Sequence, residues 1–285
     1  MKKSMGLLIV ASVMILLVLY TENQYELWSG FFVKEMTEED KAEYLNELYE
    51  HMLNKEEVIE MHFYGSEQDM EEFAINSATE VFRLDKEDTS SDYDYMRYVH
   101  YATNVEMVGR WSQYKIVYTM SYLESKEQTE QVDKEIKRII KKYKIKNMSD
   151  YNKIKTIHDY IVDHCHYDLS VDLNSPYAAL LKGASACQGY AALFYKMMTE
   201  AGVPCRVITG TANGSLHAWN IVKLGDVWYN VDTTWDDPVG LIGDSHARYD
   251  YFLKTDEGMK KHTRDAEFAT DTFYAQYPMA RKSYR

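Results

Sequence analysis

The sequence has few cysteines and no excess of basic residues, and both shortages exclude classes of protein. Three cysteines are too few for a disulfide scaffold, and their odd number leaves one thiol unpaired unless chains cross-link; Cys165 and Cys205 could pair and leave Cys187 free. The 45 acidic residues outnumber the 32 basic ones and give a net charge of −13, so we exclude nucleic acid as a partner. The 285 residues, 46% hydrophobic and 27% charged, are typical of a globular protein with one large or two modest domains.

An uninterrupted apolar run stands at the N-terminus. Lys2 and Lys3 precede 16 apolar or small residues at positions 5–20, a length of about 24 Å as a helix, slightly short of a bilayer core. No A-x-A-like cleavage site follows directly. We therefore predict that residues 1–24 are a signal or an uncleaved membrane anchor. With the lysines inside, the body of the protein lies outside the cell, anchored through the run or secreted if the segment is cleaved.

The rest of the chain divides into a smaller α/β region over 35–123 and a larger region over 125–285. In the smaller region, which has no motif that carries chemistry, periodicity predicts helices over 37–52 and 68–82, a strand over 57–64, and an antiparallel strand pair over 93–101 and 111–122. In the larger region it predicts helices over 126–144 and 149–164.

Cys187 lies at the predicted start of another helix. The segment Ser185-Ala186-Cys187-Gln188 has the S-x-x-Q form of a capping box, with Ser185 as the N-cap, and the apolar stripe that follows ends at Gly202. In the first turn, free backbone N–H groups and the helix dipole favour a thiolate and could hold an oxyanion. A cysteine on an apolar stripe is more often an inert core residue, so this reading requires a nearby base.

A predicted β-hairpin supplies the base. Two strands joined by a two-residue Gly-Asp turn are expected over 217–224 and 227–233. If Leu224 faces Val227, His217 lies opposite Thr234, and His217 and Asp232 are diagonal neighbours on one face, with backbones about 7–8 Å apart. A register shift of one residue would separate them. The carboxylate would fix the imidazole tautomer and leave the other ring nitrogen for the Cys187 thiol.

These motifs together resemble the transglutaminase-like superfamily. They are GASACQGYA at 183–191, His-Ala-Trp-Asn at 217–220 and Asp-Thr-Thr-Trp-Asp at 232–236. The resemblance covers about 153–238 and extends weakly to Tyr251-Phe252 and His262, in a tail also seen in extracellular bacterial members. It implies an α+β fold with a papain-like core, in which the cysteine helix packs on an antiparallel sheet. It also implies that Cys187 is the nucleophile, His217 the base and Asp232 its orienting partner, without a cofactor or metal.

The sequence departs from the family pattern just before the cysteine. Ser185 and Ala186 replace the usual glycine and valine, and both are small enough for a tight helix start. The family's oxyanion donor lies upstream of the cysteine; Tyr167 and Tyr177 are candidates for it. Three tryptophans near the hairpin could shield the site from water, namely Trp219, Trp228 and Trp235.

A metal site is the weaker interpretation of a second dense group of residues. It consists of His158, His164, Cys165 and His166. Adjacent residues rarely point the same way, and neither C-x-x-C nor H-E-x-x-H spacing is present, so we expect a helix end with solvated histidines and no metal.

Three classes of function remain open. A thioester at Cys187, formed from a protein or peptide amide, could be resolved by an amine, which is acyl transfer, or by water, which is hydrolysis. The third class is a non-catalytic binding module on the same fold, against which the complete set of Cys187, His217 and Asp232 argues. Surface location suggests cell-wall peptides or surface proteins as substrates.

Overall fold

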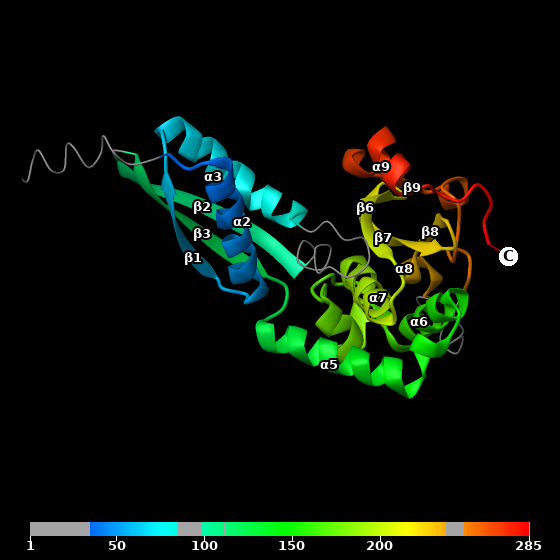
Figure 1. Cartoon of the computed structure of the whole chain (residues 1–285). Coiled ribbons are helices and arrows are strands. Elements are labelled where there is room, and N and C mark those ends of the chain that lie inside the picture. Colours follow the sequence, from blue (N-terminus) through cyan, green and yellow to red (C-terminus); the bar gives the residue numbers. More distant parts are fainter. Residues whose placement is uncertain (1–34, 85–98, 111, 238–247, 285) are drawn as a thin grey trace, which may run out of the picture. The chain divides into compact units, whose positions relative to one another are not determined.

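The computed structural model describes residues 35–84, 99–110, 112–237 and 248–284 (Figure 1). The apolar segment 5–20 and most of the strand predicted over 93–101 lie outside these residues. Among the described helices, none is long and apolar enough to cross a membrane. The chain forms two compact units: α2, β1, α3 and most of β2 and β3 belong to the first, and the elements from α5 onward belong to the second.

The first unit is a three-stranded sheet with two helices on one face (Figure 1). The strands lie in the order β1-β3-β2, with bounds Val58–Tyr64, Gln113–Tyr122 and His100–Arg110. The helices are α2, Glu38–Leu53, and α3, Glu67–Glu80, followed by the short turn η1, Val81–Arg83. The predicted helices and the first strand are confirmed. The first strand of the predicted pair is wrong in extent, because β2 runs on to Arg110. The side chains of residues 104–110 are largely exposed and show no alternation.

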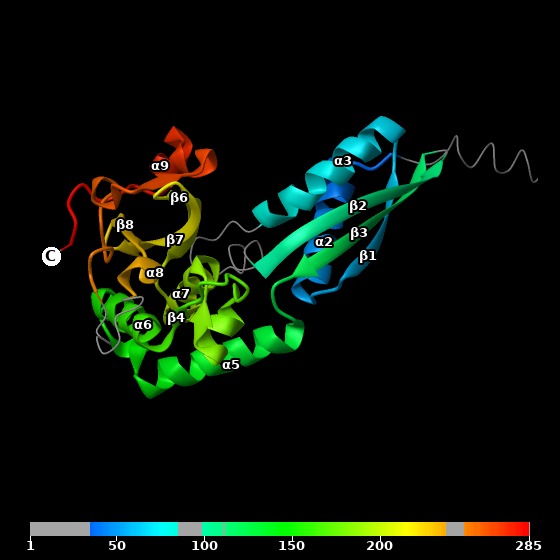
Figure 2. The same cartoon turned by 180° about the vertical axis from the view of Figure 1, so that it is seen from behind.

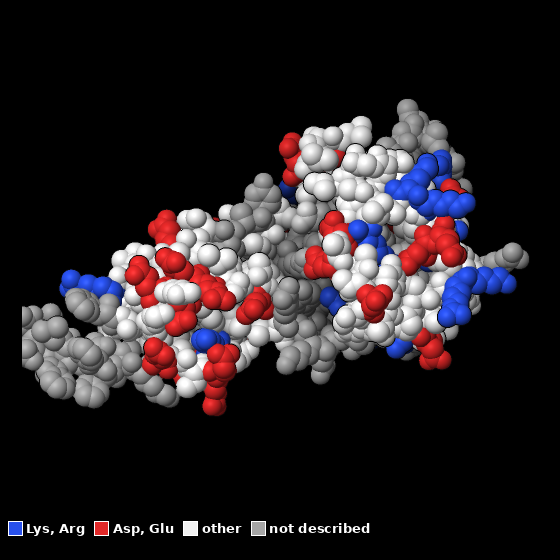
Figure 3. Space-filling view, turned by 90° about the horizontal axis from the view of Figure 1, so that it is seen from above, with Lys and Arg blue, Asp and Glu red and all other residues white. Residues whose placement is uncertain are grey.

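Acidic side chains are concentrated in this first unit. Its described residues hold 16 Asp and Glu against three Lys and Arg, an excess of 13 acidic residues that equals the net charge of the whole chain. Figure 3 shows a face on which these acidic side chains gather with few basic ones among them. The rest of the chain is balanced in charge, so the acidity that excluded nucleic acid in the sequence is a property of the first unit.

The second unit begins with helices that pack against one another (Figure 2). They are α5, Lys126–Lys142, α6, Asp150–His164, and α7, Cys187–Ala201. Ser125 and Ser149 cap the first two through their hydroxyls, and α7 ends at Gly202 as predicted. Between α6 and α7 lie β4, His166–Tyr167, η3, Ala178–Lys182, and β5, Ala184–Ser185.

An antiparallel sheet in the order β8-β7-β6-β9 follows. Its strands are β6, Cys205–Ala212, β7, Ser215–Leu224, β8, Val227–Val231, and β9, His262–Arg264. The predicted hairpin register is confirmed from Leu224–Val227 to Asn220–Val231. The predicted strand end is wrong: β8 stops at Val231, and Asp232 caps the one-turn helix α8, Thr233–Asp236.

Alternate residues of β7 point to opposite faces of this sheet and belong to two different hydrophobic clusters. Ala218 and Val222 pack with the helices α5 to α7, whereas Trp219 and Ile221 pack with the C-terminal segment. That segment contains η4, Glu257–Met259, η5, Ala266–Ala269, and α9, Asp271–Gln276. Both faces are therefore covered, which holds β7 rigidly in the middle of the unit.

Gly210 allows the edge strand β9 to lie close against β6. A Cβ atom at this position would stand 2.0 Å from the carbonyl oxygen of Thr263, far inside contact distance. Gly210 pairs with Arg264 on one side and with His217 on the other. The absence of a side chain here therefore brings β9 next to the strand pair that carries His217.

We predict that Gly189→Ala destabilises the fold. In an ordinary helix interior this change stabilises by about 1 kcal/mol. Here a Cβ would stand 2.0 Å from the Ser185 hydroxyl oxygen and 2.7 Å from the Ser175 carbonyl oxygen, so we expect a net loss of about 1–3 kcal/mol. Urea unfolding followed by circular dichroism measures the change, and a gain in stability would show that the start of α7 is not tightly packed.

Candidate active site

Cys187 lies in the first turn of α7, as the sequence predicts, but the helix begins one residue later than predicted, at Cys187 itself. Ala186 is the N-cap, and it has no side-chain acceptor. Ser185 lies in β5, paired in parallel with β4, and its hydroxyl donates to the Leu173 carbonyl at 3.1 Å. The predicted capping box is therefore wrong, because Ser185 is already engaged in a strand and a loop. Cys187 remains partly exposed in the first turn.

His217 and Asp232 lie in direct contact. The distance from His217 Nε2 to Asp232 Oδ2 is 2.8 Å, and the Asp232 side chain is fully buried. The other oxygen, Oδ1, accepts the backbone N–H groups of Thr234 at 3.0 Å and Trp235 at 3.1 Å. The expected contact is thus present, although Asp232 reaches it as a helix cap and not as a strand residue.

The carboxylate determines how the His217 ring is protonated. An ionised carboxylate only accepts hydrogen bonds, so Nε2 must donate and the other side of the ring is left for Cys187, its second partner. Burial opposes a charge on this ring, but the hydrogen bond and charge of Asp232, with a smaller contribution from Cys187, raise the pKa of His217 to about 10. Burial alone would raise the pKa of Asp232, but His217 and His262 lower it to about 2. Near neutral pH the pair is therefore imidazolium and carboxylate, and the imidazolium lies beside the Cys187 thiol.

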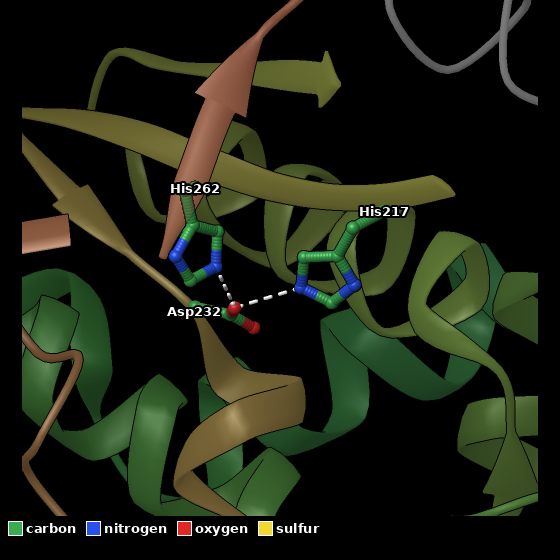
Figure 4. Close-up of side chains that lie close together, drawn as sticks. All are labelled: His217, Asp232 and His262. Carbon is green, nitrogen blue, oxygen red and sulfur yellow. Dashed lines mark hydrogen bonds and ion pairs between the residues drawn. The ribbon is translucent and has the colours of Figure 1, made fainter. Parts of the chain in front are cut away.

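A second histidine binds the same carboxylate oxygen. His262 Nε2 lies 2.9 Å from Asp232 Oδ2 (Figure 4), and its side chain is 1% exposed. The buried Nδ1 atom of His262 has no hydrogen-bond partner among the described residues. Sequence reasoning noted His262 only at the weak end of the resemblance and gave it no role, because no local pattern links it to Asp232.

Aromatic rings surround the two histidines. Trp235 lies 5.7 Å from the His217 ring and 4.6 Å from the His262 ring, and Trp219 lies 6.2 Å and 5.0 Å from them, measured between centroids. Two of the three tryptophans expected to shield the site thus contact its rings. Trp228 instead packs edge-on against Tyr277.

One group of potential metal ligands lies close together in the described part of the chain. It is His217, Asp232 and His262, with ligand atoms within 4.8 Å of one another. Two N–H donors that meet one carboxylate oxygen satisfy these groups without an ion, and a metal would have to replace both hydrogen bonds at about 2.0–2.1 Å. We therefore assign no metal to this group.

Of the two candidate oxyanion donors, Tyr167 lies in β4, where it pairs with Ser185, two residues before Cys187. Burial, followed by the charges of Cys187, Asp168 and Asp232, raises the pKa of the Tyr167 hydroxyl, which places it in the electrostatic field of the site. The surroundings of Tyr177 are different, since its backbone N–H donates to Glu124 Oε2 at 3.1 Å. The pairing of β4 with β5 and the charge contact with Cys187 favour Tyr167 over Tyr177 as the candidate donor.

Comparison with known proteins identifies the domain. Residues 137–233 match the family model of the transglutaminase-like superfamily. The chain carries a transglutaminase-like domain. Its α+β fold fits this assignment, and the matched range includes Cys187, His217 and Asp232 but stops short of His262.

Two named relatives and a solved structure share part of the chain. The kyphoscoliosis peptidases of mouse and human are 29% and 28% identical to it over 121 residues. Each match covers 36% of this chain and only 18% of the peptidase. A crystal structure of a TGase has 18% identity and a TM-score of 0.35, and the alignment covers 53% of this chain and 50% of that one.

His158, from the second dense group, has a structural role. The prediction that it is solvated is wrong. Its ring is fully buried, with Nδ1 3.0 Å from Asp159 Oδ1 and Nε2 3.0 Å from Asp236 Oδ2. Asp236 is also fully buried, so His158 is the cation that compensates it. His164, in contrast, is exposed, with Nδ1 2.8 Å from the Tyr160 carbonyl oxygen.

We predict that His158→Leu destabilises the protein by about 3–5 kcal/mol near neutral pH, because it leaves a buried carboxylate unpaired. Burial would lower the pKa of His158, but Asp159 and Asp236 raise it. The stability that His158 contributes is thus complete below about pH 6.5, the unfolded pKa, and declines as the pH rises through the folded pKa. Urea unfolding at several pH values measures this difference. His164→Leu serves as the control, and an equal effect of both changes would contradict the assignment.

Proposed function

We propose that this domain is a cysteine-dependent enzyme that acts on protein or peptide amides through a thioester at Cys187. The observation that carries the proposal is the position of the His217 ring between the Cys187 thiol and the buried Asp232 carboxylate. A nucleophile, a base and an orienting group in this order form the minimal set for acyl transfer. The matched superfamily range contains all three residues.

The reaction follows from the protonation states. The Cys187 sulfur attacks the amide carbonyl carbon, and the C–N bond breaks as the His217 imidazolium gives its proton to the leaving amine. The resulting thioester is then attacked by water or by a second amine, whose proton returns to His217 as the Cys187 sulfur leaves. Backbone N–H groups at the start of α7, with the Tyr167 hydroxyl, would hold the negative oxygen during both steps.

The relatives support a reaction on amide bonds, but they do not decide whether water or an amine resolves the thioester. The mouse and human proteins are named peptidases, which supports hydrolysis, but the match spans a small part of each. The proposed location is the outer face of a cell membrane, with residues 5–20 as the anchor; this rests on the sequence. Substrates there would be cell-wall peptides or surface proteins.

We predict that Asp232→Asn slows iodoacetamide labelling of Cys187 near pH 7 by about tenfold or more. The new amide has one oxygen and one NH2 group, so on one side its NH2 must face N–H donors. When the NH2 faces His217, the Nε2 atom of the ring must accept, and the single ring proton moves to the nitrogen that faces sulfur. The ring is then neutral and no longer favours a thiolate. A free cysteine is only a few per cent thiolate at this pH, which sets the expected fall. Peptide mass spectrometry separates Cys187 from the buried Cys165 and Cys205. Slow labelling of the unaltered protein would favour a binding module instead.

We predict that Cys187→Ala abolishes product formation, by more than about 10³-fold, whichever acceptor is used. The full chain is mixed with a glutamine-bearing protein and a labelled primary amine, and both incorporated label and new N-termini are measured. Label that depends on Cys187 identifies transfer, whereas new N-termini without label identify hydrolysis. Activity retained in Cys187→Ala would overturn the thioester mechanism.

A further inference from the structure

The proposed catalytic residues do not explain His262, which is among the most enclosed groups of the site. Its ring lies 4.6 Å from Trp235, 5.0 Å from Trp219 and 5.5 Å from Tyr251, measured between centroids. Its Nε2 atom meets the same Asp232 oxygen that binds His217, from the opposite side (Figure 4). A buried imidazole aimed at the orienting carboxylate requires an explanation beyond core packing.

We propose that His262 is a positioning residue of the active site, which fixes Asp232 Oδ2 against His217 and shares the carboxylate charge with it. The inference rests on the proposed function, since it concerns how His217 acts on Cys187. His262 lies outside the matched range 137–233, so the site extends into the C-terminal segment.

The hydrogen bonds of Asp232 show why a second imidazole matters. Two backbone N–H groups hold Oδ1, and the two rings donate to Oδ2, so four donors fix the carboxylate. Without His262, Oδ2 would have a single donor, and its charge would act on His217 alone. His217 would then hold its proton more firmly and pass it to the leaving amine less readily.

His217, and not His262, is the histidine that exchanges protons with the cysteine. Cys187 is a partner of the His217 ring, whereas the buried Nδ1 of His262 has no partner among the described residues. The polar contact that the structure gives the His262 ring is the one from Nε2 to Asp232 Oδ2. His262 therefore acts through Asp232.

The strand that carries His262 is firmly held. Besides the close pairing at Gly210, Arg264 Nη2 donates to Asp256 Oδ1 at 2.7 Å and to Asn230 Oδ1 at 3.0 Å. The same Asn230 oxygen accepts the Trp219 indole N–H at 3.1 Å. These bonds tie β9 to β7 and β8, so the position of His262 is built into the sheet.

Several other titratable or charged groups face the two histidines and Asp232 and must be considered in any pH profile. They are Cys187 from α7, Tyr167 from β4, Asp236 from α8, Tyr251, and Lys261, whose Nζ lies 5.8 Å from the Trp235 ring.

Iodoacetamide labelling of Cys187 in the full chain, followed from about pH 5 to pH 11.5, tests the proposal without a substrate. We expect two rises in rate for the unaltered protein, the upper one at about pH 10, where His217 loses its proton. His262→Phe keeps a ring but removes the donor, so we expect the upper rise to move up by about one pH unit. His262→Gln places an amide donor where Nε2 stands, so its profile should match that of the unaltered protein.

His262→Asn, whose amide is one methylene too short to reach Oδ2, provides a second variant without the donor should phenylalanine prevent folding. Circular dichroism at each pH confirms that every variant is folded. An unmoved upper rise in the Phe or Asn variant, or an equal shift in the Gln variant, would overturn the role of His262 and leave the proposed function intact. A single rise typical of an ordinary thiol in the unaltered protein would instead overturn the proposed function.

Discussion

The arrangement of the candidate active site depends on one buried charge, the Asp232 carboxylate. Removal of a carboxylate from water costs several kcal/mol unless donors replace the lost hydration. Here four N–H groups replace it, from the first turn of α8, from β7 and from β9. Because these donors belong to three elements, the charge holds together the end of a helix and two strands that are not adjacent in the sheet. The same contacts that stabilise the ion orient the His217 ring toward Cys187.

The short helix α8 connects the Asp232 site to the helical part of the unit. Asp232 stands at its N-terminus and binds the histidines of the sheet, while Asp236 at its other end binds His158 of α6. The backbone around Tyr251 is tied to both ends, since its N–H donates to Asp236 Oδ1 and its carbonyl accepts the Asp232 N–H. A one-turn helix is not stable by itself, so its geometry is set by these polar contacts. A displacement of His158 would therefore also displace Asp232, through α8.

The sequence was informative where local periodicity decides structure. It predicted that Cys187 lies in the first turn of α7, and it predicted the hairpin register and hence the meeting of His217 with Asp232. It was wrong where a side chain had two possible partners. Asp232 caps a helix instead of extending β8, because its carboxylate takes two backbone N–H groups there, and Ser185 binds Leu173 instead of capping α7. His262 could not be assigned, since a three-residue edge strand has no readable period and its partner lies 30 residues away.

The two imidazoles on one oxygen of Asp232 affect how firmly His217 holds its proton and how readily it releases that proton. A carboxylate devoted to one histidine would stabilise the imidazolium so strongly that proton transfer to the leaving amine would slow. A second donor on the same oxygen, from His262, weakens the attraction between the carboxylate and the His217 imidazolium. The His217 ring stays in place, since the other carboxylate oxygen is already held by two backbone N–H groups. The reactivity of Cys187 would then be adjusted by a residue that never meets the substrate. On this proposal the functional unit is larger than residues 137–233, because it includes the edge strand that carries His262.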